Sequence, residues 1–217
     1  MQLQIAPSIL SADFANLGKD IRMLNSCADL IHLDIMDGTF VPNISFGFPI
    51  VEAVSKIATI PMDAHLMVVH PERWVKRCAE LGVQMMSFHP EAAGDDSGNI
   101  LDDIKAHGMK AGLVINPDIP VEKLFPYIGK ADFFLIMSVF AGFGGQKFIP
   151  ESLNKIAALK KELEKKGSKT PIEVDGGVNL SNALSLKEAG AGILVAGSSV
   201  FNAEDPEEAV SMLRNPR

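Results

Sequence analysis

The 217-residue chain has few cysteines and lacks the segments that would place it outside the cell or in a membrane. Its two cysteines, Cys27 and Cys78, are far apart and form no CxxC pair, so we expect free thiols in a reducing compartment. No apolar run approaches the roughly 18 residues of a membrane span, and the first residues resemble no signal peptide. These absences predict a cytoplasmic protein without a membrane partner.

Positive charge is also scarce. Twenty Lys and Arg residues against 27 Asp and Glu residues give a formal net charge of −7. The densest basic stretch, residues 160–166, is interleaved with Glu162 and Glu164, which is typical of a solvated helix face. We therefore expect no nucleic-acid partner.

No linker or low-complexity stretch divides the chain, and β-like runs alternate with helical patterns. We expect strands near residues 4–10, 30–36, 61–67, 84–89, 110–116, 132–139, 171–175 and 192–197. Asp13 is expected to cap one helix, Pro71 and Pro150 to open two more, and a further helix to span residues 181–189. Eight parallel βα units over residues 1–217 predict a single-domain (β/α)8 TIM barrel.

An open, doubly wound sheet is the alternative, because alternation alone does not show closure. In an open sheet the polar residues should gather at one switch point. Here they are expected at the carboxyl ends of nearly all strands: Ser8, His32 with Asp34, His65, His89, Asn116, Ser138, Asp175 and Ser198. Such a ring of polar groups favours the barrel.

Two histidines and two aspartates of these strands predict a metal site. His32 and Asp34 are two residues apart in an apolar run, so they project from the same face of a strand. The segment Asp63–Met67 repeats the pattern with His65, and Asp175 ends the seventh strand before two glycines. Imidazole with carboxylate suits one divalent ion, zinc, iron, manganese or cobalt, without choosing among them.

Glycine-rich turns after the last three strands predict a phosphate site. They are Gly142, Phe143, Gly144 and Gly145, then Gly176 and Gly177, then Gly197 with Ser198. Glycines let backbone amides approach an anion, and TIM barrels often bind phosphate with the loops after strands seven and eight. The turns match neither a Walker loop nor a dinucleotide fingerprint.

Three methionines, Met36, Met67 and Met137, are expected at similar depth in strands two, three and six. Core filling is the ordinary interpretation of such residues. If Asp34 and Asp175 face a substrate, the thioethers form a nonpolar, polarizable wall near the reacting carbon.

Across nearly its whole length the sequence resembles the ribulose-phosphate 3-epimerase family. The matching stretches are residues 5–14, 32–43, 65–67, 88–91, 116–117, 137–139, 142–146, 174–178 and 196–198. The resemblance implies a ribulose-phosphate-binding TIM barrel that interconverts D-ribulose 5-phosphate and D-xylulose 5-phosphate, a reaction of the pentose phosphate pathway. It also implies a homo-oligomer, in which the apolar Phe46, Phe48 and Phe125 are buried by folding or by a partner.

The resemblance assigns roles to individual residues. It implies that His32, Asp34, His65 and Asp175 hold the metal, that Asp34 and Asp175 are the acid/base pair, and that Ser8 and His65 contact the substrate. The resemblance also implies that the three glycine-rich turns bind the phosphate. One stretch departs from the family pattern, which usually has a polar residue and proline where this chain has Phe140 and Ala141.

Other functions remain as alternatives. A D-allulose 6-phosphate 3-epimerase needs the same chemistry and a longer pocket, on which Phe140 and Ala141 would bear. A Schiff-base aldolase needs a lysine at a carboxyl strand end, whereas the expected strands contain only Lys110, at the opposite end. A related decarboxylase or synthase would carry an Asp-x-Lys-x-x-Asp strand. A non-catalytic sugar-phosphate binder would lose one of the two aspartates.

Overall fold

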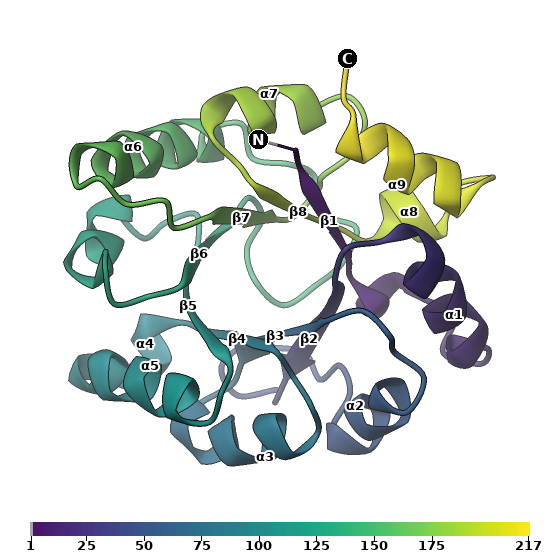
Figure 1. Ribbon diagram of the computed structural model, residues 1–217, viewed down its shortest axis with the longest axis horizontal. Coiled ribbons are helices and arrows are strands. Elements are labelled where there is room, and N and C mark those ends of the chain that lie inside the picture. Colours follow the sequence, from purple (N-terminus) through teal and green to yellow (C-terminus); the bar gives the residue numbers. More distant parts are fainter. Residues whose placement is uncertain (1) are drawn as a thin grey trace.

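The computed structural model describes residues 2–217, and within them eight parallel strands form a nearly closed barrel surrounded by helices (Figure 1). The strands are β1 (Gln4–Pro7), β2 (Ile31–Met36), β3 (Met62–Met67), β4 (Met85–Phe88), β5 (Lys110–Ile115), β6 (Phe133–Met137), β7 (Ile172–Asp175) and β8 (Ile193–Ala196). Neighbouring strands pair in chain order from β2 to β8, and β8 pairs with β1. A parallel bridge between Ser8 and His32 brings β1 to β2, so the barrel is favoured over the open sheet.

Helices follow most strands and cover the outside of the barrel, as the alternation predicts. The α-helices are α1 (Leu17–Cys27), α2 (Phe48–Ser55), α3 (Val75–Glu80), α4 (Pro90–Ala93), α5 (Ser97–Ala106), α6 (Ser152–Lys165), α7 (Ala183–Ala189), α8 (Ser198–Phe201) and α9 (Pro206–Arg214). The 3-10 helices are η1 (Ile9–Ser11), η2 (Pro71–Trp74), η3 (Gly94–Asp96) and η4 (Val121–Tyr127).

The first helix starts later than Asp13 predicts. The Asp13 carboxylate accepts hydrogen bonds from the Ala15 amide at 3.0 Å and from Asn16 Nδ2 at 2.7 Å, which makes a turn. The chain enters α1 only at Leu17, with Asn16 in the capping position. Phe14 is therefore outside the helix and exposed. The expectation that Asp13 caps the helix was wrong, because its side chain closes the preceding turn instead.

The middle of the barrel is filled by side chains, and one glycine makes room for the largest of them. Phe133 on β6 is fully buried, and its ring lies against Gly112 of β5. A Cβ atom at Gly112 would lie 2.4 Å from the Phe133 ring. Since a Cβ does not fit, Phe133 fills the space that a side chain at Gly112 would occupy.

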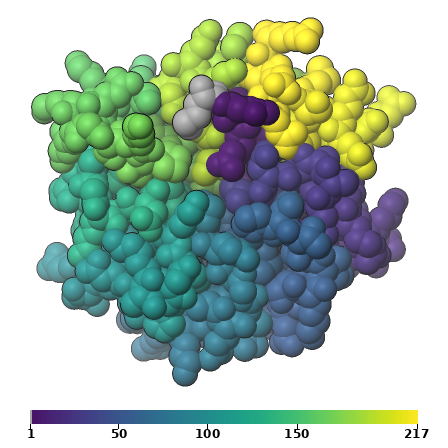
Figure 2. Space-filling model, viewed as in Figure 1, coloured from purple at the N-terminus to yellow at the C-terminus, as the bar shows by residue number. Residues whose placement is uncertain are grey.

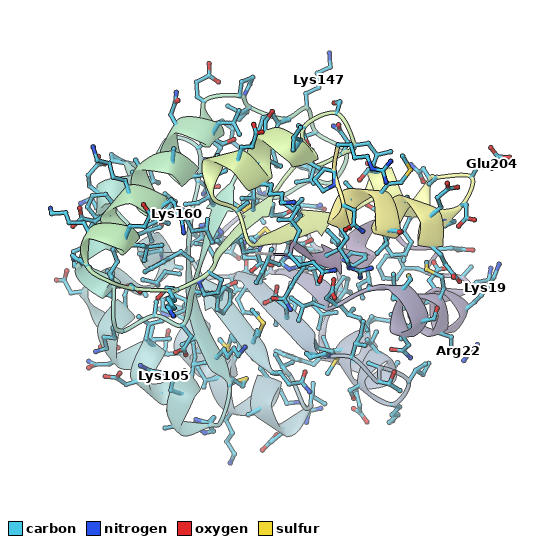
Figure 3. All side chains as sticks on the ribbon, turned by 45° about the horizontal axis from the view of Figure 1, so that its top comes forward. Lys19, Arg22, Lys105, Lys147, Lys160 and Glu204 are labelled. Atoms are coloured by element: carbon cyan, nitrogen blue, oxygen red, sulfur yellow. The ribbon has the colours of Figure 1, made fainter. Side chains whose placement is uncertain are left out.

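The two ends of the described chain lie side by side, as the adjoining purple and yellow segments of Figure 2 show. Arg214 of α9 donates from Nη2 to Asp29 Oδ2 at 2.9 Å, and the same oxygen accepts the Ile5 amide of β1 at 2.8 Å. The last helix is thereby tied to the first strand. In Figure 3 the labelled Lys19, Lys147 and Glu204 extend from the edge of the molecule, in keeping with a solvated surface.

The aromatic side chains for which we expect burial are covered to different degrees. Phe46 is buried in the core, and Phe48 and Phe125 are partly buried against it.

Cys27 and Cys78 are free cysteines, as expected. Within residues 2–217, none of the helices combines the length and apolar character needed to cross a bilayer.

Candidate active site

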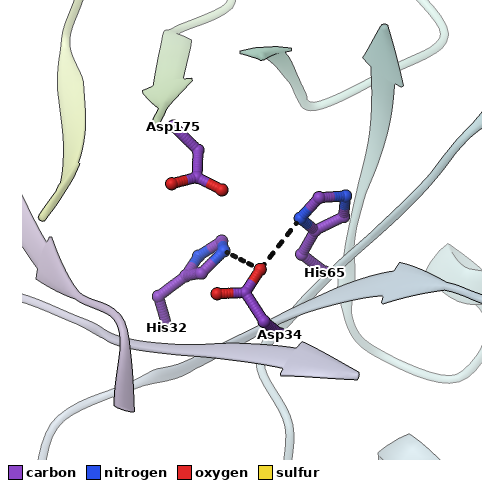
Figure 4. Close-up of side chains that lie close together, drawn as sticks. All are labelled: His32, Asp34, His65 and Asp175. Atoms are coloured by element: carbon purple, nitrogen blue, oxygen red, sulfur yellow. Dashed lines mark hydrogen bonds and ion pairs between the residues drawn. The ribbon is translucent and has the colours of Figure 1, made fainter. Parts of the chain in front are cut away.

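The adjacent strands β2 and β3 place three donor groups inside the barrel (Figure 4). Asp34 and His65 are register partners, and Asp34 Oδ1 lies 3.2 Å from His65 Nδ1. The same oxygen lies 3.5 Å from Nε2 of His32, two residues earlier on β2. All three side chains are buried. The i, i+2 spacing of the sequence thus becomes a shared position on the interior face.

Asp175 enters the same space from β7, on the other side of the barrel (Figure 4). One donor atom from each of His32, Asp34, His65 and Asp175 lies within 4.8 Å of all the others. Ligands at ~2.0 Å from a tetrahedral zinc ion lie about 3.3 Å apart, close to the 3.2 and 3.5 Å separations around Asp34. His32 Nε2 is buried and has no hydrogen-bond partner among residues 2–217. The donor set therefore fits a divalent cation.

The two aspartates of this cluster have opposite pKa shifts. Burial raises the pKa of Asp175 to about 7, and the nearby charge of Asp34 adds to the rise. Burial also raises the pKa of Asp34, but the neighbouring His32 and His65 outweigh it and bring the pKa well below its usual range. Without a cation, Asp34 is therefore the more acidic of the two aspartates, and Asp175 is the one that more readily holds a proton.

Two serines fix the Asp34 carboxylate and its backbone. Ser8 Oγ, on the segment after β1, donates to Asp34 Oδ2 at 2.6 Å. Ser45 Oγ donates to the Asp34 carbonyl oxygen at 2.5 Å and accepts the Met36 amide at 3.0 Å. Asp34 therefore presents Oδ1 to the histidines and Oδ2 to Ser8, in one defined orientation. The structure thus brings Ser8 to the site as the sequence predicts.

Behind His32 lie two buried acids that the sequence analysis did not assign to the site. Asp63 Oδ2 lies 2.7 Å from His32 Nδ1, and Glu173 Oε1 lies 3.6 Å from the same nitrogen. Burial raises the pKa of Glu173 well above its usual value, and Asp63 adds to the rise. Burial lowers the pKa of His32, but Asp34 and Asp63 outweigh it and the net pKa is raised. The sequence feature that could have identified these two acids is their i, i+2 spacing, of Asp63 with His65 and of Glu173 with Asp175, which places each pair on one face of a strand.

A third histidine lies behind His65. His89, which follows β4, approaches His65 with the two Nε2 atoms 2.9 Å apart. Phe40 packs on His89 with ring centroids 4.8 Å apart. Burial lowers the pKa of His89 well below its usual value, and the neighbouring His65 lowers it further, so the ring is neutral. Burial likewise lowers the pKa of His65.

A cavity adjoins the donor cluster, and its walls include every residue predicted to bind substrate except His65. Its lining includes Ser8, Asp34, Met36, Met67, Met137, Gly142, Phe143, Gly144, Gly145, Asp175, Gly176, Gly177, Gly197 and Ser198. His32 and His65 are fully buried and are not part of the lining. No lysine belongs to this lining within the described part of the chain, and Lys110 lies at the amino end of β5. This arrangement argues against the Schiff-base chemistry of an aldolase.

Packing alone requires glycine at both positions after β7, Gly176 and Gly177. A Cβ atom at Gly177, whose φ is +63°, would lie 2.5 Å from the Phe148 amide nitrogen. A Cβ atom at Gly176, with φ +120°, would lie 2.5 Å from Val139 Cγ2. These positions exclude other residues even without a ligand. The phosphate site therefore stays a prediction, supported by the place of the glycines in the cavity lining.

The stretch after β6 that departs from the family pattern contributes Phe140 to the cavity lining. Gln146 Nε2 donates to the carbonyl oxygens of Phe140 at 2.7 Å and Phe143 at 2.8 Å. Asn43 Nδ2 donates to the Gly142 carbonyl at 2.7 Å, which connects the loop to the segment after β2. Both phenylalanines are about half exposed and line the cavity. Phe140 thus lies where its side chain can contact a bound substrate.

Comparison with known proteins gives consistent matches over most of the chain. The model of the ribulose-phosphate 3 epimerase family matches residues 4–201. A ribulose-phosphate 3-epimerase of Bacillus subtilis is 45% identical, with coverage of 99% of this chain and 100% of the relative. One of Synechocystis is 46% identical, over 98% and 94% of the two chains. One of Mycobacterium tuberculosis is 44% identical, over 97% and 91%.

Solved structures show the same architecture at low sequence identity. A mutant tryptophan synthase alpha-subunit from Pyrococcus furiosus superposes with a TM-score of 0.70 at 17% identity. The match covers 100% of this chain and 97% of the other. Likeness at this identity supports the fold alone.

Proposed function

The chain belongs to the ribulose-phosphate 3-epimerase family, and on this basis we propose that Asp34 and Asp175 invert the C3 centre of D-ribulose 5-phosphate. The protein is an isomerase with epimerase activity. The product would be D-xylulose 5-phosphate. The observation that carries the residue assignment is the pair of aspartates in one cavity, from β2 and β7, with opposite pKa shifts.

The protonation states of the pair match their proposed roles. An epimerase without redox chemistry must remove the C3 proton from one face and return a proton to the other. Asp34, with its lowered pKa, is ionised and accepts the proton from D-ribulose 5-phosphate. Asp175, whose pKa is raised in the metal-free protein by burial and by Asp34, is the more readily protonated of the two aspartates and is assigned as the proton donor to the opposite face. In the reverse direction the two residues exchange roles.

We propose that His32, Asp34, His65 and Asp175 also hold one divalent cation, whose identity among zinc, iron, manganese and cobalt is open. When bound there, such an ion supplies positive charge that stabilises the enediolate form of the substrate. Ser8 holds Asp34 in place through the 2.6 Å hydrogen bond to Oδ2. The cluster thus combines charge stabilisation with two proton carriers.

The rest of the cavity lining suits a short sugar phosphate. Met36, Met67 and Met137 line the cavity together with both aspartates and provide apolar contacts beside the reacting carbon. We assign the phosphate to the turns 142–145, 176–177 and 197–198, where backbone amides are available without a lysine. Binding through neutral amides reconciles an anionic substrate with a chain of net charge −7.

We also propose a cytoplasmic homo-oligomer that acts in the pentose phosphate pathway. Two large apolar side chains, Ile44 at 74% and Trp74 at 38% exposure, line one hollow beside α2, which a second copy would cover. Light scattering during size-exclusion chromatography measures the molar mass of the assembly, and hence the number of chains in it. A mass of one chain at micromolar concentration would contradict self-association.

The experiment that tests the activity follows deuterium at C3. The purified protein is incubated in D2O with D-ribulose 5-phosphate or D-allulose 6-phosphate, and the metal content of the same sample is measured. We expect fast exchange and inversion at C3 of the pentulose phosphate. Preference for allulose 6-phosphate would replace the proposed substrate, and no exchange at C3 of either sugar would disprove the epimerase assignment.

A further inference from the structure

Each histidine of the donor cluster has one ring nitrogen directed at the cluster and the other directed at a buried side chain. For His32, Nε2 faces Asp34 at 3.5 Å while Nδ1 contacts Asp63 Oδ2 at 2.7 Å. Asp63 is fully buried, as is His32. A carboxylate only accepts hydrogen bonds, so Nδ1 must carry a hydrogen, and in the neutral ring that binds a cation the lone pair of His32 lies on Nε2.

For His65 the two nitrogens are used in the opposite order. Nδ1 lies 3.2 Å from Asp34 Oδ1, and Nε2 lies 2.9 Å from Nε2 of His89. Two neutral imidazoles form a hydrogen bond only if one donates and the other accepts. If Nδ1 of His65 binds a cation, its Nε2 carries the hydrogen and His89 must accept it through Nε2. The hydrogen of His89 then lies on Nδ1.

We propose that Asp63 and His89 are positioning residues that select the metal-binding nitrogen of His32 and of His65, respectively. This inference rests on the cation site of the proposed function and adds the groups that hold its ligands. Outer partners of this kind fix the tautomer and ring orientation of a ligating histidine and raise its basicity. The two partners differ, because Asp63 offers a negative charge and His89 a neutral ring. His32 is accordingly the stronger donor of the two.

Strand pairing explains why these partners are fixed in place. Asp63 is the register partner of His32, just as His65 is the register partner of Asp34. His89 directly follows β4, which pairs with β3 next to His65. Rotation of either imidazole would leave a buried nitrogen without its hydrogen-bond partner, which is unfavourable. The rings are thus aligned before any cation binds.

Glu173 provides a matched control for Asp63. It is as deeply buried and its Oε1 faces the same His32 nitrogen, but at 3.6 Å it is beyond hydrogen-bond distance. Asp63→Asn keeps an acceptor oxygen but removes the negative charge that raises the basicity of His32, and Glu173→Gln replaces the other buried carboxyl by an amide of equal size. His89→Leu removes the acceptor for His65, and His89→Gln keeps an acceptor oxygen.

The test measures the zinc affinity of the full-length protein by competition with a chelator, without substrate. We expect Asp63→Asn and His89→Leu to weaken zinc binding by about 10- to 100-fold, and Glu173→Gln and His89→Gln to stay within about threefold of wild type. The melting temperature of the zinc-free form of each variant identifies loss of fold. Wild-type affinity in folded Asp63→Asn and His89→Leu, or an equal loss in Glu173→Gln, would overturn the proposal.

A second measurement needs no variant. In the zinc-loaded wild type, long-range proton–nitrogen NMR spectra of 15N-histidine report which nitrogen of each ring carries hydrogen. We expect hydrogen on Nδ1 of His32 and on Nε2 of His65, and the reverse pattern at either ring would refute the assignment. Neither measurement uses the sugar. A protein that binds zinc in this way but leaves ribulose 5-phosphate unchanged would therefore contradict the proposed activity alone.

Discussion

Asp34 and His65 face each other across β2 and β3, with Asp34 Oδ1 3.2 Å from His65 Nδ1. Two residues earlier the same strands pair His32 with Asp63, so each strand supplies one acid and one imidazole in opposite order. Every one of these carboxylates therefore lies beside an imidazole of the neighbouring strand. This crosswise arrangement lets two adjacent strands provide three of the four donors of the candidate metal centre.

Replacement of either proposed proton carrier, Asp34 or Asp175, should stop turnover. We expect Asp34→Asn and Asp175→Asn each to lower kcat by about a thousandfold, because an amide neither accepts nor delivers the C3 proton. The rate of epimerisation of D-ribulose 5-phosphate is measured with a coupled enzyme assay that consumes the product, xylulose 5-phosphate. Asp102→Asn changes the same charge on the exposed surface of α5 and should keep full activity. Substantial turnover in a folded Asp34→Asn variant would remove this residue from the mechanism.

Cation binding should release a proton below neutral pH. In the metal-free protein the pKa of Asp175 is about 7, so at pH 6 the carboxyl is mostly protonated and must lose its proton to bind an ion. Zinc affinity should rise about tenfold per pH unit for each displaced proton, and the contribution of Asp175 should level off above pH 7. Calorimetry in buffers of different ionisation enthalpy counts the protons. If Asp175→Asn released as many at pH 6, the displaced proton would belong to another group.

The raised pKa of Asp175 also sets the sign of a stability change. Between its ordinary value near 4 and about 7, the folded metal-free protein binds a proton at Asp175 that the unfolded chain has lost. The contribution of this group to the free energy of unfolding therefore decreases as pH rises through that interval. Denaturant unfolding at pH 5 and pH 8 should show the loss, and Asp175→Asn should reduce it.

A negative charge at the predicted phosphate site should weaken substrate binding. Ser198 is exposed, lines the cavity and begins α8. Two unit charges 4 Å apart repel by about 1–4 kcal/mol between water and a protein surface, so Ser198→Asp should raise KM about tenfold or more. Ser211→Asp adds the same charge at an exposed position of α9 and serves as the control. An unchanged KM in Ser198→Asp would place the phosphate elsewhere.

Filling the space at Gly112 should destabilise the barrel. The added methyl group of Gly112→Ala would meet the Phe133 ring at 2.4 Å, which predicts a loss of about 1–3 kcal/mol. The Phe133→Leu background should reduce this loss, because the shorter side chain leaves room. At Gly18 the nearest neighbour lies 3.4 Å away, so Gly18→Ala should not destabilise. Equal denaturation midpoints for Gly112→Ala and wild type would contradict the packing argument.

Both thiols should be unreactive in the folded protein. Burial raises the pKa of Cys27 to about 11 and that of Cys78 to about 12. At pH 8 a thiol of pKa 11 is about 0.1% thiolate, the form that reacts. An aromatic disulfide reagent should therefore label the native protein slowly and two thiols per chain after unfolding. Fast labelling of the native protein would show that one of these thiols is more accessible.

Strand alternation and polar spacing were sufficient to predict the barrel and much of the arrangement of the site. The i, i+2 rule put His32 and Asp34 on one face, and the structure brings them together with His65 and Asp175. The same rule applies to Asp63 and to Glu173, but their contact with His32 depends on strand register and on packing across the barrel. Neither can be read from one strand alone.

Helix starts were harder to predict. Asp13 is of a residue type that often caps helices. Its carboxylate instead accepts hydrogen bonds from Ala15 and Asn16 in the turn of residues 13–16, and the helix begins at Leu17. Pro71 opens a 3-10 turn, η2, before α3 begins at Val75. In both cases short-range hydrogen bonds compete with the first helical turn, and composition does not decide which arrangement is more stable.

The pairing of β1 with β8 also has a consequence for the order in which the protein is made. Ribosomes release the amino end first, so His32, Asp34 and His65 leave the exit tunnel long before Asp175 and the glycine turns. Until β7 and β8 follow, β1 lacks its ladder partner β8 and is held beside β2 by the bridge at Ser8 and by the hydrogen bonds of Ile5 with Asp29 and Leu30. The nascent chain therefore carries three of the proposed metal ligands without the fourth. Enzymatic activity, in turn, reports that synthesis has passed β8 and that the ring of strands has closed.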